Sequence, residues 1–418
     1  MSINNETGLK FLLYLLNKNK SLNSLPDKIA NLSPEDWEIL LKQAKQRDLS
    51  LLLYDHLHSI EDFEVVPQAV IRQLYNIYLA ASARNAVMLH HAGKILQALR
   101  NNNIQVIVLK GLYLIESIYK SIGLRTFVDL DILVHKDDIP LSLSIMQSMG
   151  FTLSTYFDPA VLLTDIKHVP PLIKENGPCV EVHWGILEEN EPFNINIDGI
   201  WQRAVPVRSA DIDTLAMCTE DLILHLCLHY TYQHRLRAGL KFLFDIAEVI
   251  TLRADQINWH KLISTAKDWK VERVLRLSLQ LCERITGVQV LDEVKTTLQN
   301  IAVDESLLDT ALRQTLTLGI EHVNMTPDVV AFTNAPGVIG KLKRLLQRVF
   351  VSRIVLARIY NQNPKSPVIF LYYFVRFYDL YRIYASSSWR LLHGEKSMRK
   401  SFQLEQDSLS LRDWMIEN

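Results

Sequence analysis

Two aspartates, Asp129 and Asp131, stand two positions apart in the apolar segment TFVDLDILV (126–134). The β-branched and aliphatic residues of this segment predict a strand, in which residues two apart point to the same face. Both carboxylates therefore project together, and a cation is the natural way to stabilise them against repulsion and desolvation. Because Mg²⁺ prefers carboxylates combined with substrate phosphates, the pattern favours a metal site with a nucleotide as co-ligand. The alternative is an edge strand with two solvated acids.

A second candidate group, Lys110-Gly111, follows a short β-branched run (104–109) and precedes a stretch of helical pattern. Glycine lets the backbone approach a phosphate closely, the helix N-terminus supplies N–H donors, and Lys110 adds positive charge. The alternative is an ordinary strand-to-helix turn with an exposed lysine. Arg125 lies four residues before Asp129, where it can neutralise a phosphate or pair with the two aspartates.

A third carboxylate, Glu181, lies in CVEVHW (179–184), whose alternating pattern predicts another strand with Glu181 and His183 on one face. An acid on a neighbouring strand would complete a two-metal site and provide a base for an acceptor hydroxyl. The alternative is a polar face with a His–Glu pair. Taken together, the three groups are much more specific than any one of them, because they follow in strand–turn–helix–strand–strand order.

These groups lie in segments through which the chain resembles the uncharacterised nucleotidyltransferases of the DNA polymerase β-like superfamily. The resemblance covers residues 30 to 285 approximately and implies a small mixed sheet whose strand acids bind two divalent metals, Mg²⁺ or Mn²⁺. It also implies transfer of a nucleotidyl group from an NTP to a hydroxyl acceptor on a protein, an RNA or a small molecule, with release of pyrophosphate. The segments that carry it are VIVLKGLYLIESIY (106–119), LRTFVDLDILV (124–134), VEVHWGI (180–186), EDLILHLCLHY (220–230) and LKFLFDIAEVI (240–250).

Under this resemblance, Asp129 and Asp131 correspond to the paired metal ligands and Glu181 to the third acid. The same three acids would be the catalytic residues. Arg125 matches the family's arginine before the acids, and the resemblance implies that it binds phosphate.

The resemblance also places Lys110 and Gly111 at the superfamily's glycine-containing phosphate turn. The chain departs from the superfamily here, because many members have Gly-Ser or Gly-Gly whereas this sequence has Gly111-Leu112. The hydroxyl that would contact a phosphate is therefore absent, and Lys110 is a candidate to substitute for it. The alternative to an enzyme is a catalytically silent scaffold that keeps the nucleotidyltransferase fold and binds a partner.

Further candidates lie outside the strands, in segments that the resemblance places near the nucleotide. Lys241 or Asp245 would face the nucleotide from a helical lobe packed on the sheet. His225 and His229 are four apart on one predicted helix face, a spacing that suits either a metal or a packed, hydrogen-bonded core. His168 is a candidate cleft residue without an assigned chemistry.

Composition narrows the class of protein but not its chemistry. The 418 residues are 48% hydrophobic and 22% charged with a formal net charge of −1, so the chain is expected to be globular and no global charge indicates a nucleic-acid or membrane partner. Only 14 glycines and 14 prolines occur, which favours long helices over a many-stranded sandwich or barrel. The four dispersed cysteines fit a reducing compartment, and no apolar run is long enough to span a bilayer, so we expect a cytoplasmic protein.

The expected fold is α+β and mostly helical, with a small mixed sheet at the centre of the nucleotidyltransferase core. Patterning predicts an N-terminal helical region (1–103), the α/β core (104–210), a helical lobe packed on it (211–300) and a basic, aromatic helical region (301–418). The boundaries follow the changes between helical and strand periodicity.

The C-terminal region carries a local charge that the neutral total hides. Residues 329–378 contain no Asp or Glu but eight Lys or Arg, and aromatic residues alternate with arginines through 368–392. Three interpretations remain open for residues 368–392: a groove for nucleic acid, which would extend over 341–392, an interfacial membrane helix, and a helix whose aromatics cover the rest of the protein.

Overall fold

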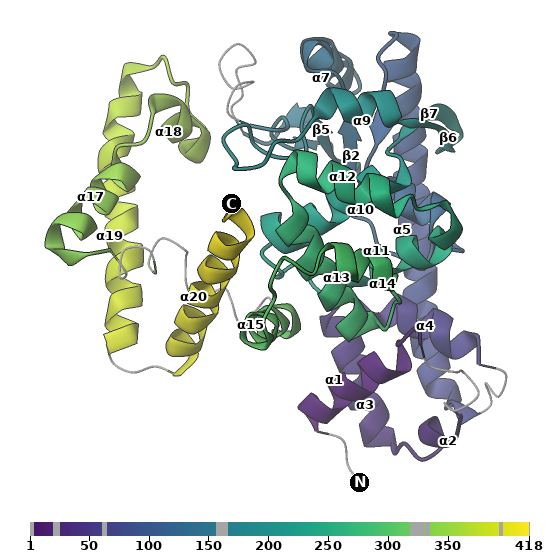
Figure 1. Cartoon of the computed structure of the whole chain (residues 1–418). Coiled ribbons are helices and arrows are strands. Elements are labelled where there is room, and N and C mark those ends of the chain that lie inside the picture. The colour runs from purple at the N-terminus through teal and green to yellow at the C-terminus, as the bar shows by residue number, and fades with distance from the viewer. Residues whose placement is uncertain are drawn as a thin grey trace.

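Helices dominate this computed structural model and surround one mixed β-sheet, so the expected α+β, mostly helical class is confirmed (Figure 1). The structure describes residues 4–19, 26–60, 65–155, 166–317, 330, 335–392 and 396–417.

The sheet has seven strands in the order β3-β4-β5-β2-β1-β7-β6. Its central pairs β2–β5 and β1–β7 are parallel, and the other neighbouring pairs are antiparallel. The sheet is open, because β3 and β6 are its two edges. The strands are β1 (Ile107–Val108), β2 (Asp129–Leu133), β3 (Thr152–Leu153), β4 (Leu172–Ile173), β5 (Cys179–His183), β6 (Val205–Ser209) and β7 (Ile212–Ala216).

The three predicted strands are present as β1, β2 and β5, each shorter than its apolar run. The β6–β7 hairpin was not predicted from the sequence, and it extends the sheet beyond residue 210 to Ala216. Its loop, Ala210-Asp211, has positive φ at both positions (47° and 65°), as a tight two-residue hairpin turn requires. The residues that usually signal such a turn, Asn-Gly or Asp-Gly, are missing, and this explains why the hairpin was overlooked.

The N-terminal helices lead into α5 (Gln68–Asn101), which Figure 1 shows running from these helices to the sheet. The start of α3 is fixed by a reciprocal capping box of Ser33 and Asp36, with Pro34 at the first helical position. The helices of this region are α1 (Asn5–Leu15), α2 (Pro26–Ile29), α3 (Pro34–Gln46), α4 (Ser50–His58) and α5.

The core and the helical lobe share one continuous hydrophobic interior, which runs from the N-terminal helices through both faces of the sheet to α13. The α/β core contains, besides its strands, the helices α6 (Lys110–Ser117), η3 (Lys136–Asp138), α7 (Ile139–Ser148) and α9 (Ile197–Arg203). The lobe comprises α10 (Thr219–Cys227), the π-helical turn η4 (Leu228–Gln233), α11 (Lys241–Leu252), η5 (Ala254–Gln256), α12 (Trp259–Trp269), α13 (Glu272–Thr286) and α14 (Asp292–Thr297).

Two C-terminal helices, α15 (Glu305–Leu316) and α20 (Lys396–Ile416), pack against the lobe. Between them in sequence come α17 (Gly337–Val349), α18 (Arg353–Tyr360), η7 (Pro367–Phe370) and α19 (Leu371–Leu392), whose two small apolar clusters are separate from the main core. Among the described residues, no helix has both the length and the apolar character needed to cross a membrane.

Candidate active site

The pairing of β2 with β5 brings the predicted acids together. The two strands run parallel with Asp131 directly opposite Glu181, so the third carboxylate lies beside the aspartate strand as expected. Leu130 and Ile132, on the opposite face of β2, are fully buried. Because side chains alternate along a strand, burial of these apolar residues fixes the register and turns both aspartates to the other face.

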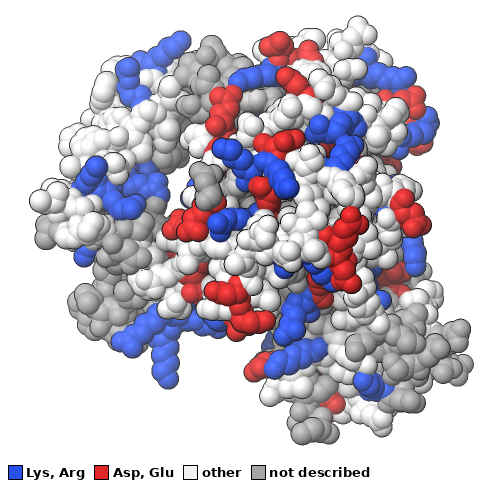
Figure 2. All heavy atoms as spheres, viewed as in Figure 1, with Lys and Arg blue, Asp and Glu red and all other residues white. Residues whose placement is uncertain are grey.

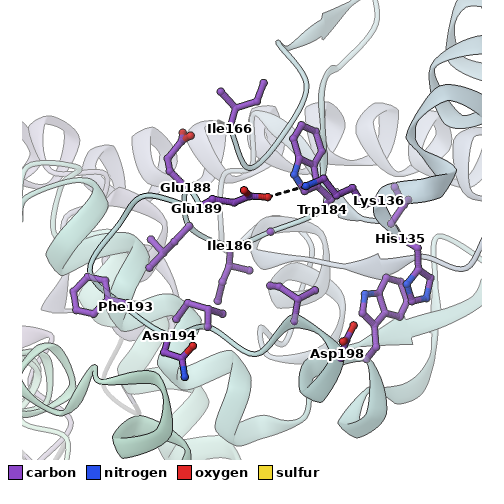
Figure 3. A pocket seen from close by; sticks show the side chains of 16 residues that line it. His135, Lys136, Ile166, Trp184, Ile186, Glu188, Glu189, Phe193, Asn194 and Asp198 are labelled. Atoms are coloured by element: carbon purple, nitrogen blue, oxygen red, sulfur yellow. Dashed lines mark hydrogen bonds and ion pairs between the residues drawn. The ribbon is translucent and has the colours of Figure 1, made fainter. Parts of the chain in front are cut away.

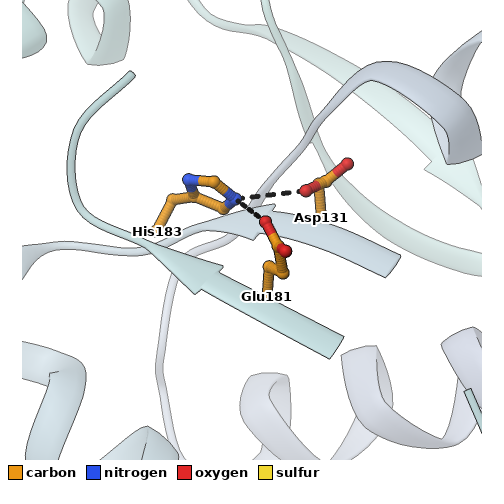
Figure 4. A group of neighbouring side chains, drawn as sticks. All are labelled: Asp131, Glu181 and His183. Carbon is orange, nitrogen blue, oxygen red and sulfur yellow. Dashed lines mark hydrogen bonds and ion pairs between the residues drawn. The ribbon is translucent and has the colours of Figure 1, made fainter. Parts of the chain in front are cut away.

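His183 connects the two strands on the acidic face (Figure 4). Its Nε2 lies 3.1 Å from Asp131 Oδ1 and 3.3 Å from Glu181 Oε2. One ligand atom from each of the three residues lies within 4.8 Å of the others, a separation that can hold one metal ion. The sequence placed His183 on the same face as Glu181 but did not indicate this contact with Asp131, because it depends on how the strands pair.

Asp131 is the most buried acid of the group, at 3% exposed, and both Lys110 and His183 contact it. Lys110 Nζ lies 3.4 Å from the Oδ1 atom that His183 also contacts. Burial alone would raise the pKa of Asp131, but Lys110 and His183 together hold it well below its usual value. The pKa of Glu181 is also lowered, chiefly by the hydrogen bond from His183. Both carboxylates are therefore ionised at neutral pH and suited to bind a cation.

Asp129 lies on the same face of β2 but outside the group that shares one ligand position. Burial raises its pKa, and the negative charges of Asp131 and Glu181 raise it further. A carboxylate whose pKa is raised accepts a proton more readily than the neighbouring carboxylates do, and this property suits a general base. Its role as a second metal ligand stays a prediction.

The turn after β1 has the geometry of a functional site. Lys110 begins α6 with a φ of +34°, a conformation that residues other than glycine rarely adopt and that tends to occur at such sites. A Cβ on Gly111 would lie 3.2 Å from Arg125 Nη1 and from the Phe127 side chain, so a larger residue would displace them. Leu112 is fully buried, which accounts for the absence of a serine here: this position packs in the core. Phosphate binding by Lys110 and Gly111 stays a prediction.

Arg125 is paired with Asp245 of α11 rather than with the aspartates of β2. Its Nε and Nη2 donate to the two carboxylate oxygens at 2.7 Å and 2.8 Å, and both side chains are buried. Although burial disfavours the charged guanidinium, Asp245 raises its pKa. The Tyr119 hydroxyl donates a further hydrogen bond of 2.7 Å to Asp245. The structure thus joins two of the sequence candidates in one pair that fastens α11 to the strand side of the site.

Lys241 lies at the start of α11 and contacts other parts of the chain. Its Nζ lies 3.3 Å from Thr126 Oγ1 and 3.6 Å from Asp48 Oδ2, and 5.3 Å from the centre of the Phe242 ring. Binding of the nucleotide by this lysine stays a prediction.

Lys167 and His168 lie shortly before β4; the sequence made His168 a candidate cleft residue and gave Lys167 no role. The main chain of His168 bridges to His183, and the two imidazole rings lie 4.8 Å apart. Burial and the nearby Lys110 lower the pKa of Lys167 to about 8, while burial and His183 lower that of His168 to about 4. No spacing pattern in the sequence joins Lys167 to β2, so the place of this lysine follows only from the fold.

Three histidines lie close to the acidic face: His225 of α10, His229 of η4 and His234 directly after η4. His225 and His229 are buried, at 2% and 9% exposed, in agreement with the core interpretation of this pair. Burial, reinforced by Lys110, lowers the pKa of both well below the usual value. His229 contacts Gln233 at 3.0 Å and His234 at 3.2 Å, whereas His225 Nε2 is buried without a hydrogen-bond partner. Both are neutral side chains at physiological pH.

A pocket of about 540 Å³ opens where the two acidic strands end (Figure 3). Its lining begins at Val134 after β2 and at Trp184 after β5. Lys136 pairs with Glu189 at 2.7 Å on its wall, and the ring of His135, another lining residue, stacks on that of Trp201. Ligands commonly bind at the carboxyl ends of parallel strands, so this pocket is placed to receive part of a substrate.

Comparison with known proteins identifies the family. The family described as uncharacterised nucleotidyltransferase matches residues 33–287, which is more than half of the chain and contains the sheet and the helices around the acids. The chain belongs to this family, as the resemblance implied. No curated protein and no solved structure matched it.

Proposed function

We propose that this member of the uncharacterised nucleotidyltransferase family transfers a nucleotidyl group from an NTP to a hydroxyl acceptor and releases pyrophosphate. The observation that carries the proposal is the in-register pair Asp131 and Glu181, joined by His183 and contacted by Lys110. Acids at this density on one face of a sheet are stabilised by cations, and the family's substrate would bring phosphates to the same place.

The donor set fits a divalent metal. Asp131 and Glu181 offer carboxylate oxygens and His183 an imidazole nitrogen, all within 4.8 Å of one another. Mg²⁺ and Mn²⁺ both bind carboxylate oxygens, so the two acids suit either ion. When bound, such an ion would neutralise the triphosphate and orient the leaving pyrophosphate.

The residues around the acids have distinct tasks in this proposal. Lys110, and Lys167 in its protonated form, would bind the phosphates and stabilise the charge that develops on them. The acceptor oxygen would attack the α-phosphorus while the bond from that phosphorus to the bridging oxygen breaks. Asp129, whose pKa is raised by burial and by its acidic neighbours, would take the proton from the acceptor hydroxyl.

The pocket beyond β2 and β5 is the space that we assign to the acceptor. It adjoins the ends of the strands that carry the acids, and Trp184, whose indole Nε1 is buried without a hydrogen-bond partner, is part of its lining. An unpaired buried donor carries a free-energy cost that a bound oxygen would relieve.

Incubation of the purified protein with α-labelled ATP, GTP, CTP or UTP tests the proposal, with Mg²⁺ or Mn²⁺ and with or without cell extract. We expect label to appear in protein, RNA or a small molecule, and Asp131→Asn and Glu181→Gln to abolish transfer. The matched control is Asp255→Asn, an exposed acid outside the site, which should retain full activity. If nucleotide binds in calorimetry but no label is transferred under any condition, the chain is a silent scaffold and the proposal is wrong.

A further inference from the structure

The exposed apolar side chains of this protein are concentrated in one part of the chain. Of the 23 large apolar residues that are exposed in the described ranges, 14 lie between Ile339 and Tyr381. They belong to α17, α18, η7 and α19, which we call the basic arm (337–392). Figure 1 shows the basic arm at the left, with α20 between much of it and the main body. Soluble proteins rarely expose contiguous apolar patches of this kind unless they bind something.

On α17 the exposed apolar residues form a stripe. Ile339, Leu342 and Leu346 follow one another at spacings of three and four, so they lie along one side of the helix, and they are 84%, 53% and 45% exposed. Phe350, directly after the helix, continues the stripe at 65% exposed. Val349, seven residues after Leu342, is buried in a small cluster that the arm forms with α20, so the exposed stripe borders the side of α17 that packs.

The segment η7–α19 presents a second stripe of the same kind. Leu371, Phe374 and Tyr378 recur at helical spacing and are 61%, 76% and 60% exposed. Phe370, at the end of η7, is also more than half exposed. Internal contacts also hold the arm together, among them the hydrogen bond from Tyr373 Oη to the Val351 carbonyl.

The basic arm carries an excess of positive charge beside its exposed apolar side chains. Residues 337–392 contain ten Lys or Arg and one acid, Asp379, and Lys343, Arg344 and Lys365 are among the exposed cations. Figure 2 shows blue side chains set among white ones at this edge of the molecule. Cations beside exposed aliphatic and aromatic residues match a surface that is both anionic and apolar.

We propose that the basic arm binds the surface of a bilayer that contains anionic phospholipid, with its apolar stripes in the headgroup region and its cations on the lipid phosphates. A nucleic acid is the other anionic partner, but aliphatic side chains such as Ile339, Leu342 and Leu371 offer no ring for a base to stack on. A bilayer accepts aliphatic and aromatic side chains alike. The inference is independent of the activity proposed for the acidic site.

Sedimentation of the full-length protein with phosphatidylcholine vesicles, with and without 30 mol% phosphatidylglycerol, tests this inference. We expect binding to the anionic vesicles that weakens as NaCl is raised, and little binding to the neutral ones. Lys343→Gln with Arg344→Gln should weaken binding about thirtyfold, since each cation near the surface contributes about a fivefold gain. Ile339→Ser with Phe374→Ser should weaken it at least about tenfold, because both lose apolar area to bury.

Matched controls change equally exposed residues elsewhere. Leu252→Ser with Leu291→Ser removes apolar side chains that are 54% and 52% exposed on the helical lobe, and it should leave vesicle binding unchanged. Lys42→Gln with Lys45→Gln removes two exposed cations from α3 and should do the same. Absence of binding to anionic vesicles overturns the inference. The inference is also wrong if the protein binds a 30-nucleotide RNA but no vesicles, and the arm variants weaken that RNA binding. A dimer in light scattering that Ile339→Ser with Phe374→Ser dissociates would overturn it too.

Discussion

Replacing Arg125 by methionine removes a guanidinium that donates two hydrogen bonds to Asp245 in the interior of the protein. The two bonds are 2.7 Å and 2.8 Å long, and the side chains are 5% and 0% exposed. The variant keeps a side chain of similar length and apolar character, so it tests the charge and its hydrogen bonds. Asp245 would remain buried with only the Tyr119 hydroxyl donating to it among the partners described here.

The magnitude follows from the burial of the pair. Breaking a buried ion pair by removing one partner costs about 3–5 kcal/mol, because the other charge stays in the interior without compensation. The hydrogen bond that Tyr119 retains to Asp245 places the expected loss near 3 kcal/mol. At about 2 °C per kcal/mol for a folded unit of this size, the melting temperature should fall by about 6 °C. Arg125→Met with Asp245→Leu removes both charges and should recover most of this loss.

Thermal unfolding followed by circular dichroism, together with calorimetry of NTP binding, measures both consequences. We expect Arg125→Met to lower the melting temperature and the double variant to restore it, which a double-mutant cycle expresses as a coupling energy. If Arg125→Met instead melts within about 1 °C of the unchanged protein and loses NTP affinity, the pair is not a structural clamp and Arg125 acts on phosphate. That result would refute the reasoning from the buried pair.

Three further predictions concern the turn, the metal and the histidines. Gly111→Ala should lower the free energy of unfolding by about 1–3 kcal/mol, measured by urea denaturation, because its Cβ would lie 3.2 Å from Arg125 and Phe127; an unchanged midpoint would contradict it. Mn²⁺ at about 100 times its Kd should stabilise the protein by about 2.7 kcal/mol in thermal shift, and Asp131→Asn should abolish that gain. Burial holds the pKa of His225 well below 6.5 in the folded state. As the pH falls through 6.5, this histidine therefore binds a proton in the unfolded state but not in the folded state. Stability should therefore fall on acidification by up to about 1.4 kcal/mol per pH unit for this histidine, and His225→Leu should flatten the dependence of the urea midpoint between about pH 7.5 and pH 5.

The sequence predicted those parts of the site that depend on local periodicity. Alternation within a strand placed Asp129 with Asp131 and Glu181 with His183, and the apolar positions between them fixed which face the acids share. The burial of Leu130 and Ile132 explains why the face of the acids could be predicted, because these apolar residues take the buried face of the strand and leave the other face to the acids. The strand-to-helix turn at Lys110 was also predicted, because a β-branched run followed by glycine and a helical pattern is a local signal.

What the sequence did not show depends on contacts between distant segments. The pairing of Arg125 with Asp245 joins positions 120 residues apart, and two acids much nearer in sequence were equally plausible partners. Lys167, which the sequence did not indicate, reaches the site only because its segment lies against β5 at His183. No periodicity reports such contacts, since they follow from strand order and from the way in which helices pack on the sheet.

The contacts of His183 determine how a metal would have to bind at the acidic face. Its Nε2 faces Asp131 and Glu181, and since ionised carboxylates only accept hydrogen bonds, Nε2 must carry the proton in this structure. To coordinate an ion through Nε2, the ring would have to move that proton to Nδ1, which is buried without a hydrogen-bond partner. That arrangement leaves an unpaired buried donor and costs about 1–3 kcal/mol. An ion held by the carboxylates alone avoids this cost and leaves His183 to orient them. His183→Gln, which retains a donor but not the imidazole, should therefore keep the affinity for both Mg²⁺ and Mn²⁺; a loss of affinity for both ions in calorimetry would show that the ring itself is indispensable.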